Sequence, residues 1–262
     1  MRLIVDEKEV FIATGGREFD PALPAIVFLH GAGMDHSVWA LLARAFASHG
    51  LGVLAPDFPG HGRSAGAPLT SIAALADWTA ALVEVAGVRA ARLVGHSMGS
   101  LVALETAARH RESVTALGLI ATAAEMRVSD DLLDAAKADD HAAVDMISLW
   151  GYGYHATIGG SEAPGLWMLG GAERLLERAR PGVIFADLSA CNDYRDALAA
   201  AAKVTVPSIV IQGSRDLMTP AKGGKAIAAA IPGCRLTVLE GAGHMLMTER
   251  PDQVLVALRG AS

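Results

Sequence analysis

The chain is poor in cysteine, in charged residues and in aromatic residues. Its 262 residues include only two cysteines, Cys191 and Cys234, which form no CxxC pair and no metal-binding spacing. We expect two lone, reduced thiols that pack against neighbours, which excludes a disulfide-stabilised scaffold. Charged residues make up 19% of the chain and aromatic residues 5%. An interior rich in aliphatic residues and alanine is therefore expected.

Long apolar runs and basic clusters are also missing. No uncharged apolar run reaches the roughly 18 residues of a membrane helix. The opening residues, MRLIVDEKEV, place acids where a signal peptide has a continuous apolar segment. These absences predict a cytoplasmic protein without a membrane partner. The net charge is −6 and no lysine or arginine cluster occurs, so nucleic acid is an unexpected partner. Either a monomer or a homodimer fits the composition.

Short apolar runs are abundant instead. Hydrophobic residues make up 52% of the chain, and runs of Val, Ile and Leu alternate with helical patterns. That alternation predicts βαβ units and a parallel sheet. Residues 25–31, AIVFLHG, are continuously apolar except for the histidine, as in a central parallel strand. RLIVD and EVFIATGG near the start predict an antiparallel pair. The fold class is therefore α/β.

The alternation stops between residues 123 and 203. This segment has helical runs and a glycine-rich stretch but no convincing strand, and the strand pattern resumes at VPSIVIQG. We expect a sheet-containing core from residues 1–122 and 204–262, with residues 123–203 inserted as a helical cap. Insertions of this kind commonly act as lids over a site.

Ser97 lies between two glycines where a strand pattern changes into a helix pattern. The motif GxSxG occurs twice, at Gly95–Gly99 and at Gly62–Gly66, but the second follows a proline-containing loop and precedes no helix. In a nucleophile elbow the strand turns into the helix within about one residue. Glycines two positions either side remove side chains that would collide. Ser97 is therefore the candidate nucleophile.

A serine nucleophile needs a base and a group that orients the base. Asp216 and His244 each come shortly after a predicted strand, so the chain order is Ser, Asp, His. The carboxyl ends of parallel strands meet at one edge of the sheet, so the three side chains are expected to converge. Asp216 is the candidate orienting acid, and His244 the candidate general base and then acid.

A glycine-containing turn, HGAG at residues 30–33, follows the predicted strand 25–31. Acyl transfer produces a tetrahedral oxyanion, which needs preorganised hydrogen-bond donors. The backbone N–H of Met98, at the start of a helix, is one candidate. The N–H of Ala32 is the other, with Gly33 as its alternative.

The chain resembles the α/β-hydrolase superfamily of serine hydrolases over nearly its whole length. The resemblance rests on HGAG, PDFPGHGRS, GHSMGS, GSRDLMTP and GAGH, in that order. It implies a mostly parallel eight-stranded sheet with helices on both faces, an inserted helical cap, and no metal or organic cofactor. It also implies a catalytic triad of Ser97, Asp216 and His244. By the same resemblance, Asp57, His61 and Ser64 shape a loop, and His30 and His96 are packing residues.

The resemblance favours an esterase that cleaves small to medium apolar acyl or aryl esters through an acyl-enzyme. Serine rather than aspartate at position 97 disfavours haloalkane dehalogenase and epoxide hydrolase chemistry. Three alternatives stay open. Carbon–carbon hydrolases of ring-fission products usually have a longer glycine run and a tryptophan where this chain has Met245. Cofactor-free haloperoxidases or perhydrolases usually have an aromatic residue at Ala32. A ligand-sensing receptor is the third.

The substrate pocket is expected to be apolar. Flexible methionines adapt to irregular ligands, and several methionines and aromatic residues adjoin the motifs or lie in the insertion. The candidate pocket residues are Gly33, Met146, Trp150, Trp167, Met218 and Met245. Asp139, Asp140, His141 and His155 lack zinc-binding spacing on one helix face, so no metal site is predicted.

Overall fold

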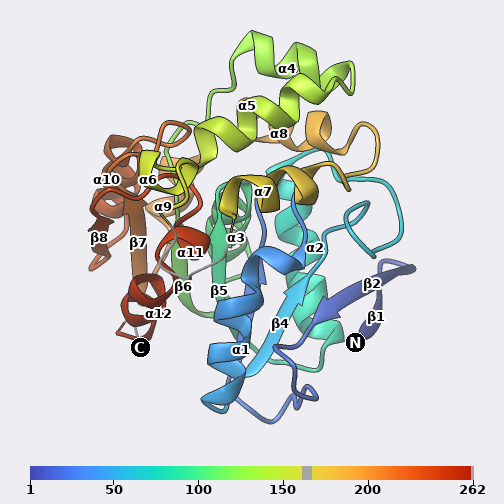
Figure 1. The fold of residues 1–262 in the computed structure, drawn as a ribbon. Helices are drawn as coiled ribbons and strands as arrows, with labels where there is room; N and C mark the ends of the chain where they lie inside the picture. The colour runs from blue at the N-terminus through green and yellow to red at the C-terminus, as the bar shows by residue number, and fades with distance from the viewer. Residues whose placement is uncertain (161–166, 261–262) are drawn as a thin grey trace.

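The computed structural model describes residues 1–160 and 167–260, and these form an α/β fold around one eight-stranded sheet (Figure 1). The strand order is β1-β2-β4-β3-β5-β6-β7-β8. β1 pairs antiparallel with β2, β2 pairs antiparallel with β4, and the remaining pairs are parallel. This confirms the expected mostly parallel sheet and the opening antiparallel pair. The strands are β1 (Arg2–Val5), β2 (Lys8–Ala13), β3 (Ala25–Leu29), β4 (Gly52–Pro56), β5 (Ala91–His96), β6 (Val114–Ile120), β7 (Ser208–Gly213) and β8 (Arg235–Leu239).

Helices cover both faces of the sheet. On one face lie α2 (Ile72–Val85), α3 (Met98–Arg109) and α10 (Ala221–Ala230), and on the other lie α1 (Ala40–Ser48) and α12 (Pro251–Arg259). Short elements complete the core: the 3-10 helices His36–Trp39 and Arg111–Ser113, and α11 (Leu246–Glu249). α11 ends at Glu249, Arg250 is the N-cap of the next helix, and Pro251 starts α12, the last helix of the described residues.

The two faces of the sheet bury alternate residues of the same strands. In β3, Val27 and Leu29 pack with α2 and α3, whereas Ile26 and Phe28 pack with α1. Every residue of β3 is buried, which explains its continuous apolar sequence. A strand buried on both faces is held firmly, so the loop that follows it has a fixed starting point.

In the part of it that the structure describes, the insertion between β6 and β7 contains helices and loops and no strand. It stands above the carboxyl ends of the strands, at the top of Figure 1. Its helices are α4 (Asp130–Lys137), α5 (His141–Gly151), α6 (Tyr154–Thr157), α7 (Met168–Leu176), α8 (Val183–Asp193) and α9 (Ala197–Ala201). The last of these, α9, packs against α3 and α10 and so belongs spatially with the core.

Local sequence explains how α4 and α5 are separated. Ser129 and Asp140 cap the two helices, each accepting a hydrogen bond from a backbone N–H in the first turn. Between them Asp139 adopts φ +50°, a left-handed conformation that ends the first helix.

Both cysteines are free, as expected, with Cys191 buried and Cys234 partly exposed. None of the helices formed by the described residues is long and apolar enough to span a membrane.

Candidate active site

Ser97 occupies a strained turn between β5 and α3. Its backbone angles are φ 52° and ψ −120°, a conformation that few non-glycine residues adopt. A Cβ atom on Gly95 would lie 2.0 Å from the Gly99 oxygen, and one on Gly99 would lie 2.2 Å from the Leu29 oxygen. Both glycines are therefore required for β5, α3 and β3 to approach this closely. The strand-to-helix turn predicted around Ser97 is present.

Asp216 and His244 lie beyond β7 and β8 and are hydrogen bonded to each other. His244 Nδ1 is 2.9 Å from Asp216 Oδ2, and both side chains are buried. The Thr219 hydroxyl donates to the same carboxylate oxygen at 2.7 Å, and the N–H groups of Met218 and Thr219 donate to the other. Burial alone would raise the pKa of Asp216, but the electrostatic interaction with His244 and these hydrogen bonds outweigh it and lower the pKa. The carboxylate is therefore kept ionised.

The backbone of His244 is fixed from two sides. Its N–H and that of Met245 both donate to the Gly151 carbonyl at 3.0 Å, and its own carbonyl lies 3.0 Å from His96 Nε2. Burial, together with the nearby His244, lowers the pKa of His96 to about 3. His96 is thus neutral, and its Nε2–H donates to the His244 carbonyl. The resemblance predicted a packing role for His96, and the structure adds this hydrogen bond.

Glu249, at the end of α11, holds the His244 loop to the insertion. Its carboxylate accepts the Gly243 N–H at 3.0 Å and the Gly153 N–H at 3.1 Å. It is 2% exposed, and this burial raises its pKa. The sequence analysis missed both Glu249 and Thr219. Thr219 had a weak signal, because it lies three residues after a candidate acid and just before a proline.

One cavity of about 390 Å³ contains both Ser97 and His244. His244 Nε2 is buried and has no hydrogen-bond partner among the described residues, so it is available to accept a proton. Most other wall residues are apolar, and many come from the insertion. The wall consists of Ala32, Met34, Ser97, Met126, Arg127, Val128, Ser129, Leu132, Ile147, Trp150, Gly151, Leu188, Cys191, Leu217, Met218, Thr219, His244 and Met245.

The pocket residues predicted from the sequence divide into two groups. Trp150, Met218 and Met245 line this cavity. The other three do not contribute to its wall: Gly33 packs against Ile184 of α8, Met146 of α5 is partly buried against an apolar cluster that spans the core and the insertion, and Trp167 is 65% exposed. The sequence predicts which residues of the insertion form helices, but not how each helix is rotated about its own axis. That rotation decides which side chains face the cavity.

The loop after β3 supplies one candidate oxyanion donor. Ala32 lines the cavity, and within the described residues its N–H donates no hydrogen bond; the same holds for the N–H of Met98 at the start of α3. Gly33, the alternative to Ala32, donates its N–H to Asp187 Oδ2 at 2.8 Å. This hydrogen bond leaves Ala32 and Met98 as the available pair.

Ser64, in the second GxSxG motif, has a different environment. It is fully buried, its hydroxyl donates to the Asp57 carbonyl at 2.7 Å, and it accepts the Phe11 N–H at 3.0 Å. The loop-shaping role that the resemblance implied for Asp57 and Ser64 agrees with these contacts. Neither residue is placed to attack a ligand in the cavity.

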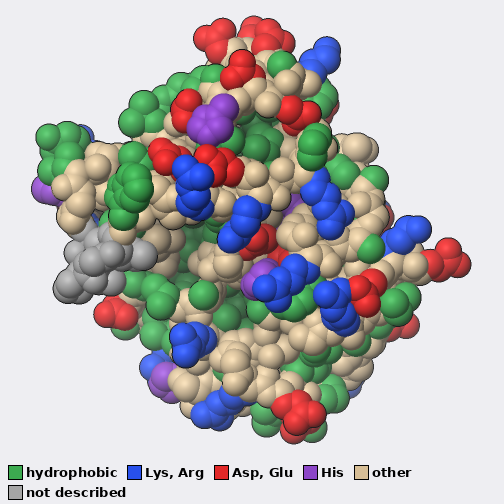
Figure 2. All heavy atoms as spheres, turned by 45° about the vertical axis from the view of Figure 1, so that its right-hand side comes forward, with side chains coloured by type: hydrophobic (Ala, Val, Ile, Leu, Met, Phe, Trp, Pro, Cys, Tyr) green, Lys and Arg blue, Asp and Glu red, His purple; other side chains and the backbone are tan. Residues whose placement is uncertain are grey.

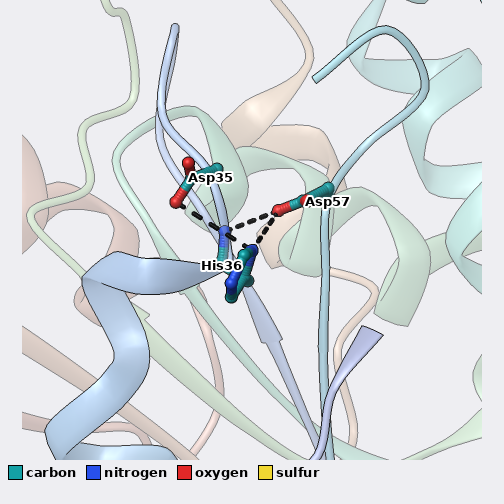
Figure 3. A group of neighbouring side chains, drawn as sticks. All are labelled: Asp35, His36 and Asp57. Carbon is teal, nitrogen blue, oxygen red and sulfur yellow. Dashed lines mark hydrogen bonds and ion pairs between the residues drawn. The ribbon is translucent and has the colours of Figure 1, made fainter. Parts of the chain in front are cut away.

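Asp35, His36 and Asp57 form a group whose ligand atoms lie within 4.8 Å of one another (Figure 3). Asp57 Oδ1 accepts the N–H of His36 at 2.8 Å and lies 2.7 Å from its Nδ1, and Asp57 Oδ2 accepts the Arg63 N–H. Asp35 accepts from the Ser37 N–H and from the Arg178 guanidinium. Because protein donors already bind these oxygens, the group serves to link the loop after β3 to the loop after β4 by hydrogen bonds.

Comparison with known proteins identifies the family of the fold. Residues 26–258 match the family model described as the alpha/beta hydrolase family. The chain belongs to the alpha/beta hydrolase family. Within this family it is 31% identical to a pimeloyl-[acyl-carrier protein] methyl ester esterase from Chromobacterium violaceum, over 84% of this chain and 87% of the relative. A protein of the same description from Xanthomonas campestris is 33% identical, over 90% and 93%.

Among solved structures, the enol-lactonase from Burkholderia xenovorans superposes with a TM-score of 0.89. It is 25% identical and covers 100% of this chain and 99% of its own. The family membership, the eight-stranded mostly parallel sheet and the helices on both faces confirm the predicted fold class. The esterases among the relatives support a hydrolase that acts on esters.

Proposed function

We propose that the protein is a serine esterase in which Ser97 is the nucleophile, His244 the general base and acid, and Asp216 the orienting carboxylate. The observation that supports this most strongly is the free Nε2 of His244 in the cavity that Ser97 lines, while its Nδ1 is held by Asp216. This arrangement fixes the imidazole tautomer with the proton on Nδ1 and the lone pair on Nε2.

The proposed reaction has two stages. Ser97 Oγ attacks the ester carbonyl carbon as His244 Nε2 takes its proton, and the N–H groups of Ala32 and Met98 stabilise the oxyanion. His244 then gives the proton to the leaving alcohol, which forms the acyl-enzyme. Water, deprotonated by the same imidazole, attacks the acyl carbon and releases the acid.

The cavity supports an apolar acyl or aryl ester of small to medium size. Methionine, leucine, isoleucine and tryptophan make up half of its wall residues, and its volume of about 390 Å³ lies in the range of small-molecule sites. We propose that residues 123–203 act as the cap, because they supply much of this wall. Methyl esters and lactones are the first substrates to test, since relatives carry those descriptions.

The test is an activity panel over p-nitrophenyl and methyl esters of graded acyl length, with a lactone and a ring-fission diketone. Turnover of the esters by the wild type, and its loss in Ser97→Ala without loss of the folded state, is expected. Preferential cleavage of the diketone would favour the carbon–carbon hydrolase instead. A single turnover that ends in a stable adduct would favour a ligand sensor. Full ester turnover by Ser97→Ala would refute the proposal.

A further inference from the structure

The insertion is joined to the core beside the oxyanion loop by a buried acid–histidine pair. Asp187, on α8, and His61, in the loop after β4, are 2.8 Å apart between Oδ2 and Nε2. Their side chains are 0% and 2% exposed. Asp187 Oδ2 also accepts the Gly33 N–H at 2.8 Å. One carboxylate oxygen therefore connects three segments that are distant in sequence.

The hydrogen bonds of His61 determine its charge. Nδ1 lies 3.0 Å from the Pro59 carbonyl, and Nε2 faces the Asp187 carboxylate, so both nitrogens face acceptors. Both must carry protons to satisfy these contacts, which makes the ring an imidazolium. Burial alone would lower the pKa of His61, but the charge and hydrogen bond of Asp187 outweigh it and raise the pKa.

Other charged groups lie near this pair. Asp57, from the same loop, also favours the charged form of His61. The ring of His30, 4.9 Å away between centroids, has a pKa lowered to about 4 by burial and by His61, so it stays neutral. Arg180, between α7 and α8, donates to the Gly62 and Ser64 carbonyls next to His61. Figure 2 shows basic side chains of this kind spread across the face where the insertion meets the core.

We propose that Asp187 and His61 are positioning residues for the oxyanion hole, with Asp187 holding the Gly31–Gly33 loop in its catalytic conformation and His61 neutralising the carboxylate. The inference rests on the proposed serine-esterase function. By binding the Gly33 N–H, Asp187 fixes the peptide next to Ala32, which lines the cavity and whose own N–H donates to no group among the described residues. Gly33 has φ +68°, a left-handed conformation that this hydrogen bond helps to hold.

The neutralising charge matters because the reaction develops negative charge at the same loop. A lone buried carboxylate there would repel the oxyanion, whereas the carboxylate–imidazolium pair carries no net charge. The pair also makes a complete oxyanion hole dependent on the docked insertion. Loss of the proton from His61 at high pH would leave the Asp187 charge unopposed and slow the reaction.

The experiment compares Asp187→Ala and Asp187→Asn with Asp139→Asn as the matched control. Asp139 accepts the N–H of Gly182, the N-cap residue of the same helix α8, at 2.7 Å, and in the described part of the chain no hydrogen bond or ion pair joins it to the oxyanion loop. Kinetics are measured on the best p-nitrophenyl ester of the panel. We expect Asp187→Ala to lower kcat by about 10- to 100-fold with KM changed by less than about 3-fold, and the control to match the wild type.

Asp187→Asn keeps the shape and removes the charge, so it remains informative even if the alanine variant fails to fold. The wild type and the control should lose kcat at alkaline pH as His61 loses its proton, and Asp187→Asn should not. Ring ¹⁵N chemical shifts should show both His61 nitrogens protonated at neutral pH in the wild type and in the control, but not in Asp187→Asn.

Two results would overturn the inference: an unchanged kcat in folded Asp187→Ala, or an alkaline fall in Asp187→Asn identical to that of the wild type. Either would leave the esterase proposal standing if Ser97→Ala is inactive. If Ser97→Ala keeps full activity, the esterase proposal itself fails, and the ¹⁵N shifts still report whether the charged pair exists.

Discussion

Replacing Gly95 by alanine should separate β5, which ends just before Ser97, from α3, which begins just after it. The added Cβ would lie 2.0 Å from the Gly99 oxygen and 2.3 Å from the Gly99 carbonyl carbon, whereas real Cβ contacts below 3.0 Å essentially never occur. The neighbouring atoms are backbone, so no side-chain rotation relieves the clash. β5 and α3 must therefore move apart by about 1 Å, which is the difference between the 2.0 Å contact with the Gly99 oxygen and the 3.0 Å lower limit.

That movement displaces both Ser97 and the Met98 N–H from the reacting carbonyl. A misplacement of about 1 Å costs roughly 100-fold in rate, which corresponds to about 2.7 kcal/mol of activation free energy. Overpacking of this kind also lowers the free energy of unfolding by about 1–3 kcal/mol. We expect Gly95→Ala to show both losses, in kcat on the best ester and in urea unfolding.

The matched control is Gly171→Ala. Gly171 lies on the exposed side of α7, and an added Cβ there meets nothing within 4 Å. Alanine in a helix is favoured over glycine by about 1 kcal/mol, so this variant should be slightly more stable and fully active. Wild-type turnover and stability in Gly95→Ala would refute the claim that β5 and α3 approach too closely to leave room for a Cβ at position 95.

Two further substitutions test the surroundings of His244. Asp216→Asn should lower kcat by about 10²- to 10⁴-fold, because the imidazole loses its orienting charge; steady-state kinetics measure this, with the exposed Asp77→Asn as control, and a kcat within twofold of wild type would contradict it. Burial raises the pKa of Glu249 above its ordinary 4.5, so the folded protein holds this proton more tightly than the unfolded chain. The stability of the wild type relative to Glu249→Gln should then fall as pH rises from 4.5 through the raised pKa. Thermal unfolding at several pH values checks this, with the exposed Glu240→Gln expected to follow the wild type, and a pH-independent difference would contradict it.

The fold and the triad candidates were predictable because their signals are local. A nucleophile elbow needs its glycines within two residues of Ser97, and strand-end loops in a parallel sheet must meet at one edge. The continuous apolar sequence of β3 likewise indicates burial on both faces. Each of these patterns can be read within a short window of the sequence.

The supporting contacts were not predictable in this way. Asp187 meets His61 across 126 residues of sequence, and Glu249 meets Gly153 across 96. Such pairs depend on how the insertion docks, which amphipathic patterns leave undetermined. The same reason explains why Trp150 was placed correctly in the cavity wall while Met146 and Trp167 were not.

The central claim is that Ser97 is the residue that becomes acylated. The most direct measurement is peptide mass spectrometry after reaction with a fluorophosphonate, which forms a stable adduct with an activated serine. The account predicts a single adduct on the peptide that contains Ser97, with none on Ser64, and no adduct in Ser97→Ala. An adduct on another residue, or unmodified Ser97 in a preparation that cleaves esters, would contradict it.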